Sequence, residues 1–196
     1  MANRLNFKRI LVYILLLVLF FILIIILNLY FPQSVKNESN RDFLEKSVVI
    51  MNDVKQSYPL LNDIDIEIKL VFLDSGAAEA HKLFFSGYEV LLDYDDLKNA
   101  DEDVLKGLFA HELAHLEDYS SRLWFSMIVF GIKYALFDSY KKEVERKTDL
   151  SAIEHGFKKE FYEFRKYRLE TGSKSDLESL EENYLSLEEI ESYGTS

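Results

Sequence analysis

An unbroken apolar run near the N-terminus is the feature that most constrains how this chain can fold. Residues 10–27 contain no charged or strongly polar side chain, and apolar character continues to Phe31. Because a helix rises about 1.5 Å per residue, a run of this length matches the roughly 30 Å hydrocarbon layer of a bilayer. No small-residue cleavage site follows it. We therefore predict an uncleaved transmembrane anchor over residues 10–31.

The charges on either side of this run predict its orientation. Arg4, Lys8 and Arg9 precede it without an acidic partner, whereas basic and acidic side chains cancel in the segment that follows it. Positive residues favour the cytoplasmic side of a membrane. We expect residues 1–9 to form a cytoplasmic stub on a single-pass protein of the cell membrane, with the rest of the chain on the outer side.

The remainder of the chain reads as an α+β domain. Residues 64–70 alternate between apolar and charged side chains, as in a half-buried strand, and residues 87–93 form a second strand candidate. Between the two, residues 77–85 are expected to form a short helix. Apolar residues recur at helical spacing in four longer segments, 41–58, 104–116, 141–155 and 157–169. Asn99 and Glu102 resemble a capping box at the start of the second of these.

The domain boundaries follow from composition. Residues 33–169 hold the patterned segments and are expected to form the folded domain. Residues 170–196 are strongly acidic, with Lys174 as their one basic residue. This C-terminal tail is expected either to be solvated and partly disordered or to dock through a last short helix at residues 184–190.

The overall charge argues against one class of partner. The chain has 34 acidic and 23 basic side chains, which gives a net charge of −11 at pH 7. An acidic surface repels phosphate backbones, and the sequence has neither a basic stripe nor a glycine-rich phosphate loop. Nucleic acid is therefore not expected as a partner. Because the chain has no cysteine, a disulfide framework is excluded.

The segment HELAH carries the chemistry of this sequence. His111 and His115 lie four residues apart in a predicted helix, so both imidazoles share one face at a spacing that suits tetrahedral Zn²⁺. Glu112 directly follows the first histidine, so its carboxylate flanks the metal and can act as general base on a metal-activated water. We expect one zinc ion per chain. The competing interpretation is two exposed histidines on an ordinary helix.

A catalytic zinc site needs a third protein ligand, and Glu145 is the best candidate. Asp149 follows on the same helical face and can accept the spare N–H of a liganding histidine, which fixes that ring from the second shell. Glu143 and Asp118 remain as alternative ligands. Glu145 and Asp149 could instead belong to a surface helix with salt bridges to its neighbouring basic residues.

The HELAH segment followed by a Glu-x-x-x-Asp helix resembles the gluzincin metallopeptidases, in particular the HtpX-type and CAAX-prenyl-type membrane proteases. The resemblance covers residues 99–156. It implies a zincin-like fold with a small sheet and an HExxH active-site helix, and a membrane-anchored, zinc-dependent metalloendopeptidase that hydrolyses protein or peptide substrates. Zinc would be held by His111, His115 and Glu145, with Glu112 as the base and Asp149 as the supporting acid. The chain departs from the group in having Thr148 where alanine is usual, and in lacking additional membrane spans.

A second apolar stretch, residues 123–137, lies between the two parts of the motif. It is short for a membrane span, and a single crossing would separate Glu145 from His111. We expect a buried core helix here; the alternative is a helix that lies in the membrane interface.

The sequence suggests where a substrate binds, but it does not identify the oxyanion donor or exclude two rival functions. The strand at residues 87–93 is expected to offer an exposed edge for an extended substrate. Donors to a developing oxyanion could be Tyr119, Tyr134, Tyr140 or His155. The rivals to a peptidase are a zinc hydrolase of non-peptide substrates and a membrane-tethered binding module in which any metal is structural or incidental.

Overall fold

The computed structural model describes residues 13–14, 17–19, 21–22, 40–73, 76–83 and 87–194. The stub predicted at residues 1–9 and most of the anchor predicted at residues 10–31 lie outside these ranges. The chain divides into two units, Met1–Gln33 and Ser34–Ser196, and the second is described below. Among the residues that the structure describes, no helix is both long enough and apolar enough to cross a bilayer.

A three-stranded mixed sheet forms one part of the domain. It consists of β1 (Ile66–Val71), β2 (Ala78–Leu83) and β3 (Gly87–Asp93), in the order β1-β3-β2. β1 runs parallel to β3, with Ile68 opposite Val90, and β2 runs antiparallel to β3. Two expectations are therefore wrong. The described part of residues 77–85 forms strand β2 in place of a helix, and β3 is the central strand, so the edge strands are β1 and β2.

The other described elements are mostly helices. They are α2 (Arg41–Lys55), η2 (Pro59–Leu61), α3 (Tyr94–Leu97), α4 (Glu102–Ser120), α5 (Trp124–Leu136), α6 (Asp138–Ala152), η3 (Ile153–Phe157), α7 (Lys158–Thr171), α8 (Lys174–Asn183) and α9 (Leu187–Ser192). The four longer predicted helices are found as α2, α4, α6 and α7. The N-cap of α4 is Asp101, whose side chain accepts a hydrogen bond from the amide of Val104 at 2.9 Å, in place of the predicted capping box.

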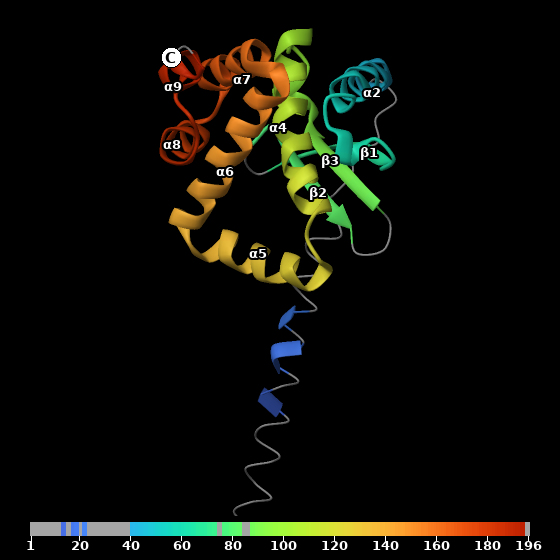
Figure 1. Ribbon diagram of the computed structural model, residues 1–196, viewed down its shortest axis with the longest axis vertical. Coiled ribbons are helices and arrows are strands. Elements are labelled where there is room, and N and C mark those ends of the chain that lie inside the picture. The colour runs from blue at the N-terminus through green and yellow to red at the C-terminus, as the bar shows by residue number, and fades with distance from the viewer. Residues whose placement is uncertain are drawn as a thin grey trace, which may run out of the picture. The chain divides into compact units, whose positions relative to one another are not determined.

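Helix α4 is the centre of the domain. Figure 1 shows it between the sheet with α2 on one side and helices α6 to α9 on the other. α4 crosses α7 at Gly107, where a Cβ atom would lie 2.1 Å from the carbonyl oxygen of Glu160, so only glycine permits this approach. The buried hydroxyl of Tyr58, which follows α2 in the chain, donates to the carbonyl of Ala110 at 2.7 Å. α4 is thereby held by α7 and by the segment that follows α2.

The acidic C-terminal segment is folded. Helices α8 and α9 each begin with a capping box, Ser173 with Asp176 and Ser186 with Glu189. Leu185 and Ile190 lie in the hydrophobic core. The disordered alternative is therefore wrong for this segment, and the compact domain continues past residue 169, the boundary predicted from composition.

Helix α5 differs from its prediction as a buried core helix. Phe130 is 6% exposed, but Ile132 is 53% and Leu136 71% exposed. α5 packs mainly on α6 through the side that carries Phe130. The core prediction is wrong because the apolar side chains on the outer side of α5 have no described element packed over them.

Candidate metal centre

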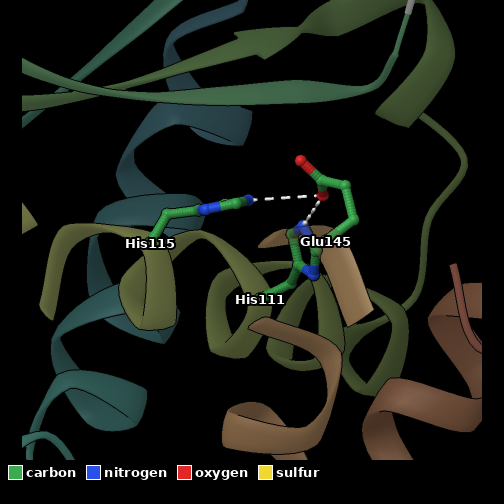
Figure 2. Close-up of side chains that lie close together, drawn as sticks. All are labelled: His111, His115 and Glu145. Atoms are coloured by element: carbon green, nitrogen blue, oxygen red, sulfur yellow. Dashed lines mark ion pairs between the residues drawn. The ribbon is translucent and has the colours of Figure 1, made fainter. Parts of the chain in front are cut away.

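Two helices bring the predicted site residues together. α4 carries His111, Glu112 and His115, and α6, which packs against it, carries Glu145 and Asp149. All five side chains are buried. In each helix the spacing of four residues places two of these side chains on one face, and the two faces meet. Figure 2 shows the carboxylate of Glu145 reaching both imidazoles.

The ligand atoms of the two histidines and the glutamate converge. Oε2 of Glu145 is 3.3 Å from Nε2 of His111 and 3.4 Å from Nε2 of His115, and the three atoms lie within 4.8 Å of one another. Ligand atoms around a tetrahedral zinc ion are separated by about 3.3 Å, given zinc–ligand bonds of about 2.0–2.1 Å. Oε2 of Glu145 is also buried without a hydrogen-bond partner among the described residues. The three residues therefore fit a metal ion in spacing and in chemistry.

The outer nitrogens of both rings contact groups on α6. Nδ1 of His111 lies 2.9 Å from Oδ1 of Asp149, although this contact lacks hydrogen-bond geometry. Nδ1 of His115 lies 3.2 Å from the hydroxyl of Thr148. Since that hydroxyl donates to the carbonyl of Val144 at 3.0 Å, its oxygen is free to accept the Nδ1 proton. The hydrogen bond with Thr148 favours the tautomer of His115 that turns an unprotonated Nε2 toward the cluster, and the carboxylate of Asp149 lies beside the corresponding nitrogen of His111.

Asp149 is itself held in place by partners that the sequence did not reveal. Nη2 of Arg165 donates to both carboxylate oxygens at 3.1 and 3.0 Å, and the amide of Leu185 donates at 2.8 Å. The guanidinium also lies over the ring of Tyr184, 4.5 Å from its centroid. The signal that could have indicated Arg165 is its place on α7, one turn after the core residue Phe161. A charged residue on an apolar face needs a buried partner.

The electrostatics of the cluster favour a positive charge at its centre. Although burial acts to lower it, contacts with Asp149 and Glu145 raise the pKa of His111 to about 10. Although burial acts to raise it, the two histidines hold the pKa of Glu145 below its ordinary value. For Glu112, burial dominates and raises the pKa. A pocket that stabilises a proton on an imidazole in this way also suits a bound cation.

Two tyrosines from the predicted set of oxyanion donors border the cluster. The hydroxyl of Tyr134, on α5, donates to Oε1 of Glu145. The ring of Tyr119 stacks on His115, with centroids 5.8 Å apart. Burial raises the pKa of both phenols, so both remain protonated donors. The sequence predicted these two tyrosines among four candidate donors, without a pattern that distinguished them from Tyr140 and His155.

The other two predicted donors lie elsewhere. His155 stacks on Tyr58 with centroids 4.1 Å apart, and its Nε2 is 3.3 Å from the carboxylate of Glu117. Tyr140 packs edge-on against Phe130. The structure gives neither of them a contact with the three metal-binding candidates.

The alternative ligands are not part of the cluster. Glu143 is exposed on α6. Asp118 pairs with Arg122 at 2.6 Å and with Lys147 at 3.2 Å, as an ordinary surface acid does. Within the described residues, the histidine and carboxylate groups that converge closely enough to hold a metal ion are His111, His115 and Glu145.

Comparisons of the chain with protein-family models, with curated proteins and with solved structures give no match.

Proposed function

We propose that the chain is a membrane-anchored zinc metallopeptidase that hydrolyses peptide bonds in proteins or peptides on the outer side of the membrane. One observation carries the proposal: three ligand atoms converge beside a buried carboxylate, Glu112, that is not one of them. Catalytic zinc sites have three protein ligands and an open position, whereas structural sites have four. The described cluster offers three.

Each residue of the site has a role in this proposal. Zinc held by His111, His115 and Glu145 would supply Lewis-acid activation of water and of a peptide carbonyl. The carboxylate of Glu112 accepts the proton of the attacking water and passes it to the leaving amine, and its raised pKa helps it to hold that proton in between. The hydroxyl of Tyr134 donates to Oε1 of Glu145, so its role is to orient this third ligand.

The sheet supports a protein or peptide as the substrate. β2 is the edge strand on the side of the sheet that packs against α4, and only one of its edges pairs with β3. An extended chain can add to such an edge through main-chain hydrogen bonds, which give affinity with little demand on side chains. Because β3 is the central strand, we propose β2 as the substrate-binding strand in place of residues 87–93.

The ligand set is tested by metal content. The full chain, purified in detergent without chelator, is expected to hold one zinc ion, as is Glu143→Ala. Glu145→Ala is expected to lose it because two histidines alone bind zinc weakly. Glu143 is the matched control, since it is a glutamate on the same helix but exposed. Folded wild-type protein without zinc, or equal zinc in both variants, would contradict the proposed site.

Catalysis is tested separately with Glu112→Gln. This variant is expected to keep zinc and to lose proteolysis of an unfolded protein substrate by about 10²- to 10⁴-fold, the usual contribution of a general base. The low exposure of the cluster favours one second candidate, a binding module with a structural metal site. Zinc in both proteins without proteolysis in either would support that candidate. Hydrolysis that depends on Glu112 but spares peptide bonds would indicate a zinc hydrolase of other substrates.

A further inference from the structure

The outer side of α5 is a continuous apolar surface. Elsewhere in residues 40–194, large exposed apolar side chains are scattered, as at Val49, Leu60 and Phe72. On α5 they gather at the spacing of one helix face, namely Phe125, Ile128, Val129, Ile132 and Leu136, and the exposed Leu123 and Phe137 flank the helix. Contiguous apolar patches of this kind mark contact sites for a partner or a membrane. Figure 1 shows α5 at one end of the domain, where its outer side faces away from the other helices of the domain.

The same segment is basic within an acidic protein. The chain carries a net charge of −11, but residues 122–142 contain four basic residues and one acidic residue. Lys133 and Lys142 are exposed. Lys133 and Lys141 lie over the rings of Tyr140 and Tyr134, which holds these two ammonium groups along the helix. An apolar face flanked by lysines is complementary to an anionic lipid surface.

The length of α5 decides how it can meet a bilayer. It has 13 residues, which at about 1.5 Å per residue is too short for the roughly 30 Å hydrocarbon layer. It can only lie in the plane of the interface. The predicted anchor ends at Phe31, and eight residues join it to Asn40, a distance of roughly 30 Å at full extension. An anchored domain is therefore within reach of the lipid surface.

We propose that α5 docks on the surface of an anionic lipid bilayer through Ile128, Val129, Ile132 and Leu136, with the exposed Lys133 and Lys142 contacting lipid phosphates. The inner side of the helix carries Phe130, which anchors it to the domain, and Tyr134, which donates to Glu145. Docking thus holds the buried cluster outside the bilayer, about one helix diameter, roughly 10 Å, from its surface. This proposal concerns a surface and does not depend on the protein being a peptidase.

The chain provides its own reporter. Its single tryptophan, Trp124, is the first residue of α5. The full chain is reconstituted into phosphatidylcholine vesicles with and without phosphatidylglycerol, using lipids brominated on the acyl chain near the headgroup. Docking at the acyl boundary predicts at least about a twofold loss of tryptophan emission to brominated lipid, with stronger quenching in the anionic vesicles.

Two variants and a control make the test specific. Val129→Asp/Ile132→Asp is expected to abolish the quenching by brominated lipid, whereas Val49→Asp, at an exposed apolar position on α2, is expected to keep it. Lys133→Gln/Lys142→Gln is expected to remove the difference between anionic and neutral vesicles. Circular dichroism checks that each variant is folded.

Other occupants of the surface give other results. If wild-type protein shows no quenching by brominated lipid in either mixture, the proposal is overturned. Quenching by aqueous acrylamide then separates the remaining cases, because it reaches a tryptophan on a helix that stays in water but not one covered by a second copy of the chain or by residues 10–31. Equal lipid quenching in wild type and Val129→Asp/Ile132→Asp would also overturn the proposal.

Discussion

Helices α5 and α6 follow one another in the chain, separated by Phe137 alone, and they reverse the usual rule of burial in opposite directions. α6 buries carboxylates, with Glu145 1% and Asp149 0% exposed. α5 exposes aliphatic side chains, among them Ile132 and Leu136. Globular domains normally do the opposite in both cases.

The difference lies in what compensates each departure. Buried carboxylates are tolerated on α6 because each has oppositely charged or hydrogen-bonding neighbours: the two histidines and Tyr134 for Glu145, whose Oε2 is left for a metal ion, and Arg165 with a backbone amide for Asp149. The exposed side chains of α5 have no such compensation within the described domain. Buried charged groups whose partners lie within the domain indicate a functional site. Exposed apolar groups that nothing in the domain covers indicate a contact with a partner or a membrane.

The largest effect is expected from breaking the buried pair on the α6 side. Arg165→Met leaves the carboxylate of Asp149 buried without its main cation, so the free energy of unfolding should fall by about 3 to 5 kcal/mol. Urea unfolding measures this loss. The experiment is done with excess chelator, so that weaker metal binding does not enter the result.

Lys159→Met is the matched control for this change. Lys159 lies on the same helix and also pairs with an acid, Asp103, but its side chain is 73% exposed. Exposed pairs contribute at most about 1 kcal/mol. If both variants lost the same stability, the distinction between the buried and the exposed pair would not hold.

An intermediate loss of stability is expected when an apolar side chain is removed from the inner side of α5, but not from its outer side. Phe130 packs against the rings of Tyr119, Tyr134 and Tyr140, so Phe130→Ala should cost about 3 kcal/mol through lost burial and a cavity. Leu136→Ala, on the outer side, should change the free energy of unfolding by less than about 0.5 kcal/mol in detergent solution. Thermal or urea unfolding compares the two. A large loss in Leu136→Ala would mean that the outer side is covered within the domain, and would remove the contrast with α6.

The parts of this molecule that sequence predicted are those governed by local spacing. The positions of His111 and His115, and of Glu145 and Asp149, follow from a helical repeat of about 3.6 residues, and the structure brings these two pairs together. The parts that sequence missed depend on distant contacts. Arg165 is 16 residues from Asp149, and the amide of Leu185 is 36 residues from it. No local pattern links such positions.

The wrong predictions have the same physical origin. The segment of β2 is rich in alanine, glutamate and lysine and so favours a helix locally, but pairing with β3 overrides that preference. α5 is apolar on all sides apart from Lys133, which typically indicates burial, yet burial depends on what covers a helix and not on the helix itself. The acidic tail folds because Leu185 and Ile190 reach the core, which outweighs its unfavourable composition.

The smallest expected effect is a loss of zinc affinity when a single hydroxyl on α6, that of Thr148, is removed. Thr148→Val keeps the shape of the side chain but removes the oxygen that lies 3.2 Å from Nδ1 of His115. Loss of such a second-shell contact typically lowers metal affinity by 10- to 100-fold, so zinc affinity measured by competition with a chelator should fall by at least about tenfold. Thr171→Val, an exposed threonine whose hydroxyl donates to the Tyr167 carbonyl, should leave the affinity unchanged. The hydroxyl of Thr148 is the hydrogen-bond partner of Nδ1 of His115, so we expect even this uncharged contact to affect metal binding. Equal affinity in the two variants would mean that the ring of His115 is oriented by packing on Tyr119 alone.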